Sequence, residues 1–294
     1  MHAFLDRYTV AVTALILGRR KWFRESLESQ GFADLIDCVQ LTVPEIKGEG
    51  FHELEAAMPQ GTLDPAFHVA QWLGHEHPTI IYHHGNNERP FNYGMGSKNT
   101  FRAVFLSRRH EFRANLISLR APFHAGSMKQ YLDKLRRMSN FTAMLAVSVK
   151  LTEALVNHLK DNGSSPVVVS GISLGGWVVN LHRSFCGTAD RYLPLLAGAA
   201  LDELFTTSCY RKLAGSLVTE NPQKVKGVLN FEEEFSRVRE ANVFPLLALY
   251  DQFIEYDRQR QCYGEGTVAV MDRGHVTGTL ASGTIRTHIL DHMD

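Results

Sequence analysis

The sequence contains few cysteines and no excess of either charge. Its four cysteines, Cys38, Cys186, Cys209 and Cys262, lie far apart and form no Cys-x-x-Cys pair, which argues against a zinc ribbon, a thioredoxin-like centre or a disulfide framework. Basic and acidic residues number 31 each, so the chain lacks the basic surplus that is typical of nucleic-acid-binding proteins. We therefore expect no nucleic-acid partner.

A long apolar segment is also missing. Tyr8–Gly18 is fairly apolar, but it is too short to span a bilayer. It also lacks the order of charged, apolar and small residues that a secretory signal shows. We interpret it as the buried face of a first helix, and we predict a cytoplasmic protein without a transmembrane segment.

The 294 residues show no internal repeat and no low-complexity linker, so we predict one domain that covers residues 1–294. Two β-rich stretches, Cys38–Val43 and Ala66–Leu73, come before a series of short apolar runs that alternate with longer helical segments. These runs are Thr79–Tyr82, Ala114–Leu119, Pro166–Ser170, Leu195–Ala200, Phe244–Leu249 and Thr267–Met271. Continuous rather than alternating hydrophobicity is typical of strands that are covered on both faces.

The order of these segments predicts an α/β fold. We expect a doubly wound, mostly parallel sheet with antiparallel N-terminal edge strands. Residues 201–240 are polar, helix-forming and longer than a simple connection needs. They are predicted to form a small helical cap over the carboxyl edge of the sheet, where ligands bind in such folds.

Residues 166–176 contain the most informative motif. The apolar run Pro166–Ser170 leads into Gly171-Ile-Ser173-Leu-Gly175, and a helix-compatible segment follows. A serine on a sharp strand-to-helix turn needs a strained backbone, and glycines at 171 and 175 remove the collisions that side chains would make there. This context favours Ser173 as an exposed nucleophile. The alternative is a glycine-rich turn that binds an anion or only packs closely.

With this motif, the sequence from about Thr79 onward resembles the α/β-hydrolase superfamily. In that superfamily a His-Gly pair often ends the third strand, and the next backbone N–H faces the substrate carbonyl. The resemblance implies that His84 and Gly85 are this pair at the border of the pocket, and that the N–H groups of Asn86 and Leu174 form the oxyanion hole. His84 is also a candidate for shaping this loop through hydrogen bonds.

The neighbouring histidines raise the alternative of a metal site, helped by His75 and His77. Adjacent side chains on a strand point to opposite faces, so His83 and His84 cannot easily share one ion. We therefore predict no metal and no cofactor. Arg120 follows another apolar run, and it is a candidate either for the pocket border, where it would meet an anionic substrate, or for a structural anchor.

The general base is predicted near the end of the chain. In the superfamily the base lies in the loop after the last strand, in the chain order serine, acid, histidine. His275 follows the run Thr267–Met271 and comes directly after a glycine, so it is the candidate base. We expect His288 to lie on the surface of the last helix.

The acid should follow the preceding strand. Asp251 has this position, although the glycine that commonly precedes the acid in the family is absent. Glu255 and Asp257 follow shortly afterwards and stay open as alternatives. Asp251 could also cap a helix that begins near Gln252.

These residues predict acyl transfer to water. Ser173 would attack an ester, thioester or amide carbonyl, and His275 would accept its proton. We expect a carboxylesterase that acts on a small-molecule acyl substrate, because neutral composition and a modest cap do not suggest a peptidase. The alternatives are an acyltransferase or peptidase with the same triad, and a catalytically inactive binding protein with this fold.

Overall fold

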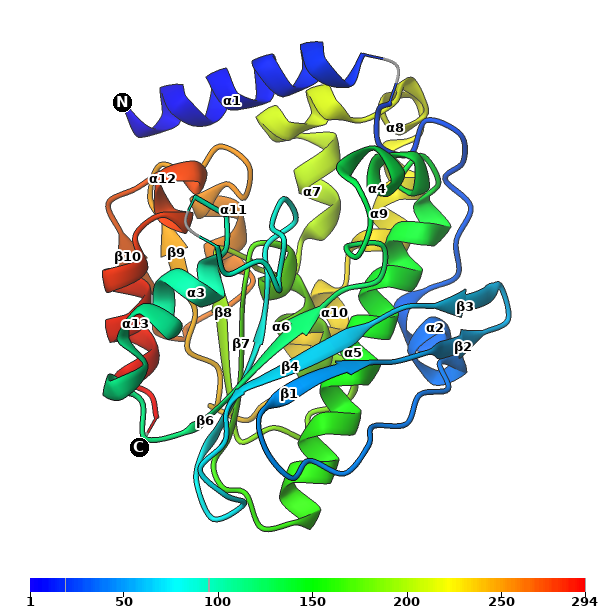
Figure 1. Cartoon of the computed structure of the whole chain (residues 1–294). Coiled ribbons are helices and arrows are strands. Elements are labelled where there is room, and N and C mark those ends of the chain that lie inside the picture. Colours follow the sequence, from blue (N-terminus) through cyan, green and yellow to red (C-terminus); the bar gives the residue numbers. More distant parts are fainter. Residues whose placement is uncertain (19, 95, 294) are drawn as a thin grey trace.

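The structure, a computed structural model, describes residues 1–18, 20–94 and 96–293. Eight strands form one mixed sheet in the order β1-β4-β6-β5-β7-β8-β9-β10, and β2 and β3 form a separate hairpin (Figure 1). The strands are β1 (Gly50–Glu53), β2 (Ala56–Met58), β3 (Gly61–Leu63), β4 (Ala66–Gln71), β5 (Thr79–His83), β6 (Asn115–Arg120), β7 (Val167–Ile172), β8 (Arg191–Leu195), β9 (Leu246–Ala248) and β10 (Ala269–Met271).

The centre of the sheet is parallel and fully buried. β5, β6 and β7 are buried along their whole length, because helices cover both faces of the sheet. All pairs from β6 to β10 are parallel, whereas β4 pairs antiparallel with both β1 and β6. The expected fold class, a mostly parallel sheet with antiparallel edge strands, is confirmed.

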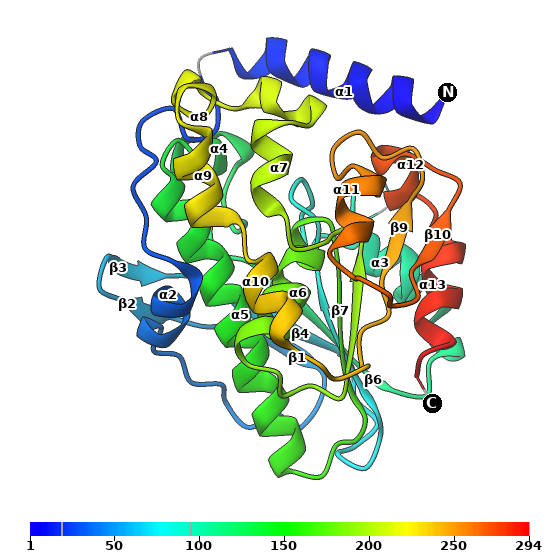
Figure 2. The same cartoon turned by 180° about the vertical axis from the view of Figure 1, so that it is seen from behind.

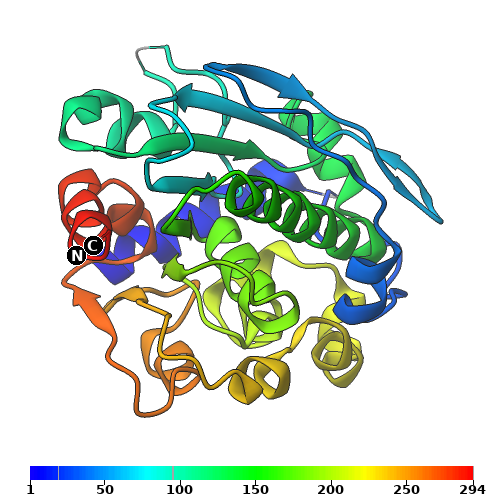
Figure 3. The ribbon, with the colours of Figure 1, turned by 90° about the horizontal axis from the view of Figure 1, so that it is seen from below.

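Thirteen α-helices and two 3-10 helices lie within the described ranges. They are α1 (His2–Leu17), α2 (Phe32–Cys38), α3 (Thr100–Val104), η1 (Leu106–Glu111), α4 (Met128–Lys134), α5 (Met138–Asp161), α6 (Leu174–Phe185), α7 (Leu201–Thr206), η2 (Cys209–Leu213), α8 (Ser216–Glu220), α9 (Pro222–Leu229), α10 (Glu232–Arg237), α11 (Tyr256–Gln261), α12 (His275–Thr279) and α13 (Ser282–Leu290). α5 and α6 pack on one face of the sheet, and α3 and α13 pack on the other (Figures 2 and 3).

The carboxyl edge of the sheet is covered from above by α1. This helix contacts η2 on one side and α12 on the other (Figure 1). Residues 201–240 form α7, η2, α8, α9 and α10. Of these, η2 contacts α1, α7 packs against η2 and α9, and α10 packs against α6 (Figure 2). None of the helices in the described ranges combines the length and the apolarity that a membrane crossing requires.

The expectation of a strand at Cys38–Val43 is wrong. α2 ends at Cys38, and Gln40 makes only an isolated bridge to Ala57. The outer antiparallel strand is instead β1, which pairs with β4.

The expected strand Leu195–Ala200 is also displaced. The strand in this region is β8, and it ends at Leu195. Leu196 has a φ of 54°, so the chain turns there and cannot continue the ladder. The apolar residues after Leu195 are buried in loop and helix contacts rather than in the sheet.

Candidate active site

Ser173 lies on a sharp turn between β7 and α6. Its φ is 54° and its ψ is −109°, a strained conformation for a residue with a side chain. A Cβ on Gly171 would lie 2.6 Å from the backbone of Gly175, so this approach requires glycine. The turn that the motif predicts is therefore present, and it holds Ser173 at the carboxyl edge of the sheet.

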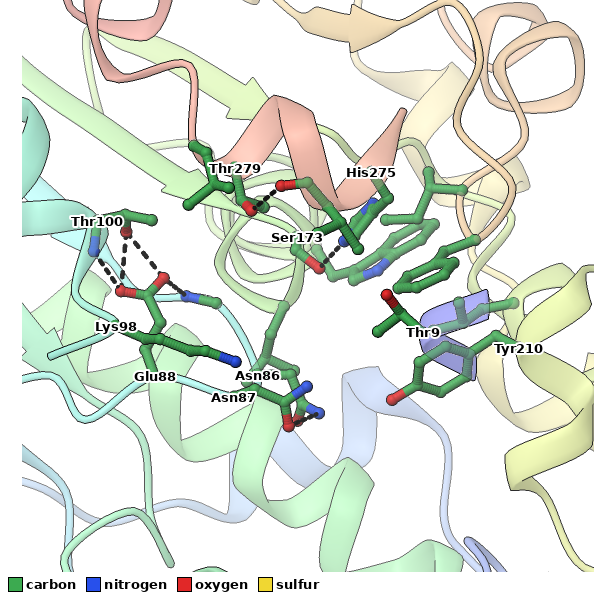
Figure 4. Close-up of a pocket in the computed structure, with 18 of the residues that line it drawn as sticks. Thr9, Asn86, Asn87, Glu88, Lys98, Thr100, Ser173, Tyr210, His275 and Thr279 are labelled. Carbon is green, nitrogen blue, oxygen red and sulfur yellow. Dashed lines mark hydrogen bonds between the residues drawn. The ribbon is translucent and has the colours of Figure 1, made fainter. Parts of the chain in front are cut away.

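The structure brings His275 to Ser173. The two atoms Ser173 Oγ and His275 Nε2 are 3.0 Å apart (Figure 4). His275 is the first residue of α12 and follows β10 by a short loop. A hydroxyl and an imidazole nitrogen at this distance form a hydrogen bond, so Ser173 Oγ–H can donate to His275.

Asp251 is the one of the three candidate acids that contacts His275. His275 Nδ1 lies 2.7 Å from Asp251 Oδ2, whereas Glu255 and Asp257 are exposed at the start of α11. The other oxygen, Asp251 Oδ1, accepts hydrogen bonds of 2.8 Å from the N–H groups of Phe253 and Ile254. These bonds fix the carboxylate in the turn after β9.

The surroundings of His275 set its protonation. Burial opposes its positive charge, but the adjacent Asp251 carboxylate and the hydrogen bond to it hold the pKa of His275 above its usual value. Nδ1–H donates to Asp251, which leaves Nε2 of the neutral ring as the acceptor that faces Ser173. The ring of Phe253 stacks on His275 with centroids 4.6 Å apart and covers the imidazole.

The two expected oxyanion donors line the same pocket as Ser173. Leu174 begins α6, and Asn86 follows the His84-Gly85 pair after β5. Within residues 1–18, 20–94 and 96–293, no protein group accepts a hydrogen bond from the N–H of Leu174 or of Asn86. Both donors are therefore available to a ligand.

The loop after β5 is tied down by other residues. Glu88 Oε1 accepts from Gly85 N–H at 2.8 Å, and the Glu88 carboxylate also accepts from Thr100 N–H at 2.6 Å. Asn86 O accepts from His124 Nε2–H at 3.1 Å, and Asn86 Oδ1 accepts from the Tyr131 hydroxyl. Burial raises the pKa of Glu88, and the hydrogen bonds from Thr100 and Gly85 offset only part of this rise.

His84 shapes this loop and does not line the pocket. Its Nδ1–H donates to Gly85 O at 2.7 Å, and its Nε2 accepts from Ala121 N–H at 3.1 Å. Burial holds the pKa of His84 well below its usual value, so the ring is neutral. Gly85 does line the pocket.

Arg120 lies away from the pocket wall. Its guanidinium forms a two-pronged ion pair with Glu53 and donates to Asp64 O at 3.1 Å. Arg120 thereby joins β6 to the edge of the sheet. Of the two roles considered for this arginine, the structure fits the structural anchor.

His288 is buried, so the expectation of a surface position is wrong. Only 8 % of it is exposed, and its Nε2–H donates to Phe244 O at 3.0 Å. It lies on α13 and joins this helix to the segment that leads into β9. His288 makes no contact with Ser173 and leaves His275 as the base candidate.

One group of side chains has the donor types of a metal site. Ligand atoms of Glu153, His182 and Cys186 lie within 4.8 Å of one another. However, Glu153 Oε2 already accepts from His182 Nε2–H at 3.0 Å and from the Thr188 hydroxyl at 2.6 Å. Hydrogen bonds therefore account for this group, which joins α5 to α6 away from the pocket.

The pocket beside Ser173 has a cavity volume of about 390 Å³ and two chemically different walls (Figure 4). The polar wall contains Asn86, Asn87, Glu88, Lys98 and Thr100, whereas Thr9 lies beside Tyr210. The apolar wall contains Trp22, Phe141, Trp177, Leu204, Phe205 and Tyr210. This division suits a ligand with one apolar and one polar end.

Two residues near the site have no motif in the sequence that would have revealed them. Glu88 lies three positions after Gly85, where loops carry many polar residues. Asp6 belongs to α1, yet its carboxylate accepts from the N–H groups of Gln252, His275 and Val276. The one sequence signal for Asp6 was a charge just before an apolar helical segment.

Comparisons with known proteins were made for the sequence and the fold. The family model "Alpha/beta hydrolase domain containing 18" matches residues 114–215, a span that includes Ser173 and ends before Asp251 and His275. A comparison with curated protein sequences found no match.

Solved structures share the fold at low identity. Acetyl xylan esterase 1 from Thermoanaerobacterium sp. is 13% identical with a TM-score of 0.55, and the match covers 94% of this chain and 98% of the esterase. Est1E from Butyrivibrio proteoclasticus is 13% identical with a TM-score of 0.53, covering 84% of this chain and 99% of Est1E. Pyrococcus horikoshii acylaminoacyl peptidase is 15% identical with a TM-score of 0.55, covering 84% of this chain and 41% of the peptidase.

The fold of the chain is therefore that of the α/β-hydrolases, and the resemblance to this superfamily is confirmed.

Proposed function

We propose that the chain is a serine hydrolase that cleaves a carboxylic ester through an acyl-enzyme intermediate. The observation that supports this most is the continuous series of hydrogen bonds from Ser173 Oγ to His275 and from His275 to Asp251, at 3.0 Å and 2.7 Å. A serine hydroxyl becomes nucleophilic when an imidazole that is oriented by a carboxylate can take its proton.

The proposed first half of the reaction forms the acyl-enzyme. Ser173 Oγ attacks the ester carbonyl carbon while its proton moves to His275 Nε2. Asp251 stabilises the imidazolium, and the negative charge on the carbonyl oxygen is stabilised by the N–H groups of Leu174 and Asn86. His275 then gives the proton to the departing alkoxide oxygen, so the alcohol leaves neutral.

The second half of the reaction releases the carboxylic acid product. Water enters the place of the alcohol and loses a proton to His275 Nε2 as its oxygen attacks the acyl carbon. The N–H groups of Leu174 and Asn86 again stabilise the negative charge on the oxygen of the tetrahedral intermediate. Collapse of this intermediate breaks the bond to Ser173 Oγ, which recovers its proton from His275.

The pocket supports a small-molecule acyl substrate. We propose that the apolar wall takes the acyl chain and that the polar wall, with Lys98, takes the alcohol end. Residues 201–240 serve as the cap of a single domain, because α7 and η2 supply Leu204, Phe205 and Tyr210 to the apolar wall. That the structural neighbours include esterases supports the ester as substrate.

A fluorophosphonate probe tests the nucleophile. We expect covalent labelling of wild type and of Ser170→Ala, and none of Ser173→Ala. Ser170 is the matched control because it lies in β7, just before the turn with Ser173, but is buried, with its hydroxyl donating to Leu193 O at 3.1 Å. Folded wild-type protein that the probe does not label would contradict the proposal and favour an inactive binding protein.

A second experiment separates hydrolysis from acyl transfer. Short p-nitrophenyl esters are offered with and without an added alcohol or amine, and the products are identified. Free acid as the main product supports the esterase. Transfer of most acyl groups to the added nucleophile would instead assign the chain to the acyltransferases. Preferred cleavage of acylated peptides over esters would assign it to the peptidases.

A further inference from the structure

Asp6 is a buried carboxylate on the first helix that contacts the far end of the chain. It is fully shielded from solvent. Asp6 Oδ2 accepts from His275 N–H at 2.7 Å and from Gln252 N–H at 3.1 Å, and Asp6 Oδ1 accepts from Val276 N–H at 3.0 Å. One side chain thus satisfies three backbone donors from two separate loops.

These two loops carry the base and the acid. Gln252 follows Asp251 directly, and the N–H of His275 belongs to the base itself. The first N–H groups of a helix have no partner within it, and the residue before α12 is Gly274, which has no side chain to cap them. Asp6 supplies this cap from α1, so the start of α12 depends on another helix.

The fit around Asp6 is tight. A Cβ on Gly274 would lie 2.8 Å from Asp6 Oδ2, so the loop approaches the carboxylate as closely as glycine permits. Two more hydrogen bonds of 2.9 Å join α1 to the same loops, from Arg7 Nε–H to Gln252 Oε1 and between His2 Nδ1 and Thr277 Oγ1. α1 is therefore fixed to both loops at three points.

The charge of Asp6 also reaches the site. Burial raises the pKa of the Asp6 carboxyl, the three N–H donors lower it, and the nearby Asp251 raises it further. Burial lowers the pKa of His275, and the Asp251 carboxylate raises it. The Asp6 charge raises it further, by a smaller amount. In the described ranges no cation forms an ion pair with Asp6, so its partners are backbone N–H groups.

We infer that Asp6 is a positioning residue for the reaction. It holds the loop of Asp251 and the loop of His275 in one arrangement, and so keeps His275 Nε2 at hydrogen-bond distance from Ser173. This inference rests on the proposed function. Its consequence is that α1 contributes to the site through Asp6, which positions the acid and the base and takes no part in bond making or breaking.

The test compares Asp6→Ala and Asp6→Asn with Val10→Ala. Val10 is buried on the same helix and contacts neither loop through a hydrogen bond, so its truncation loosens α1 without removing the cap. The rate of Ser173 labelling by the fluorophosphonate, and kcat and KM for a p-nitrophenyl ester, are measured for each. The low-field proton resonance of His275 Nδ1–H is recorded by NMR.

For Asp6→Ala we expect labelling and kcat to fall about 10- to 100-fold with little change in KM, because small displacements of a catalytic group have effects of this size. Asp6→Asn, which keeps the shape and one acceptor oxygen, should lie between wild type and Asp6→Ala. The Nδ1–H resonance should shift or broaden in both. Val10→Ala should lower the melting temperature while the labelling rate and the resonance stay as in wild type.

The outcomes separate two failures. If wild type is labelled at Ser173 and both Asp6 variants are labelled at the wild-type rate, the inference about Asp6 is wrong and the proposed function stands. If Val10→Ala loses as much rate as Asp6→Asn, the role of Asp6 is structural only, and the inference is again wrong. If folded wild type is not labelled, the proposed function falls, and the inference falls with it.

Discussion

Gly175 and His83 approach each other so closely that a Cβ at residue 175 would lie 2.1 Å from the His83 carbonyl oxygen. Gly175 belongs to the first turn of α6, and His83 is the last residue of β5. The contact involves backbone on both sides, so no side chain can move away to relieve it. This close approach brings the loop with Asn86 next to the turn with Ser173.

The first prediction concerns this contact. Gly175→Ala should abolish labelling of Ser173 and should lower the yield of folded protein, because the backbones of β5 and α6 would have to separate. Gly227→Ala is the matched control, since a Cβ there meets nothing within 4 Å and α9 should gain up to about 1 kcal/mol in stability. Thermal unfolding and probe labelling measure both variants. Wild-type labelling in Gly175→Ala would be inconsistent with this geometry.

The second prediction concerns the acid. Asp251→Asn should lower kcat by about 10⁴-fold with little change in fold, because the amide cannot hold the required His275 tautomer. Asp257→Asn is the control, since Asp257 is exposed on α11 and should keep wild-type activity. Steady-state kinetics with a p-nitrophenyl ester distinguish them. If kcat falls equally in the two variants, or falls only in Asp257→Asn, Asp251 is not the acid.

The third prediction concerns pH. His275 acts as a base only when it is neutral, so kcat/KM should fall as the pH falls through the pKa of His275. Because Asp251 holds this pKa above the usual 6.5, the midpoint of the acid limb should lie above 6.5. In Asp251→Asn the larger of the two charges that raise the pKa of His275 is gone and burial lowers this pKa, so the midpoint of the residual activity should move to lower pH. A midpoint that is the same in both proteins would contradict this account.

The fourth prediction concerns the loop after β5. Glu88→Gln replaces one carboxylate oxygen with an amide N–H₂, which faces the N–H of either Gly85 or Thr100, where an oxygen had accepted a hydrogen bond. We expect a loss of about 1–3 kcal/mol in the free energy of unfolding and a lower kcat, since the loop carries the Asn86 donor. Glu220→Gln, an exposed change at the end of α8, should alter neither. Denaturant unfolding and kinetics test both.

The fifth prediction concerns the apolar wall. Phe205→Ala should enlarge the cavity and shift the preference among p-nitrophenyl esters toward longer acyl chains, while stability falls by about 3–5 kcal/mol. Phe235→Ala should lose comparable stability without shifting this preference, because Phe235 is buried on α10 but does not line the pocket. If the two variants show the same chain-length profile, the apolar wall is not the acyl site.

The parts of the site that the sequence predicted have local signals. The close approach of Gly171 to Gly175 is a steric requirement that acts within five residues, and Gly175 must in addition leave room for the distant His83. The positions of Asp251 and His275 follow from a rule about strand order, and each lies just after an apolar run. These signals can be recognised without knowing the tertiary contacts, because residues that follow parallel strands lie at the same edge of the sheet.

Other features depend on contacts between distant segments, and the sequence did not predict them. The run Leu195–Ala200 is apolar because it is buried, but the turn at Leu196 ends the strand. Arg120 has the same sequence context whether it faces a substrate or Glu53. The role of Asp6 depends on backbone N–H groups more than 240 positions away. Nearly every residue has such a group, so the sequence does not show which ones Asp6 binds.

The path of α1 has a consequence for the newly made protein. The helix is synthesised before the segments that it binds, because the hydrogen-bond partners of Asp6 lie 246 to 270 positions later in the chain. Contacts over such separations form late, since a long loop must close before they stabilise anything. A nascent chain that has reached β8 already holds its serine elbow but still lacks an acid, a base and the groups that Asp6 binds. Translation thus delays the proposed reaction until the segment that carries His275 has been made.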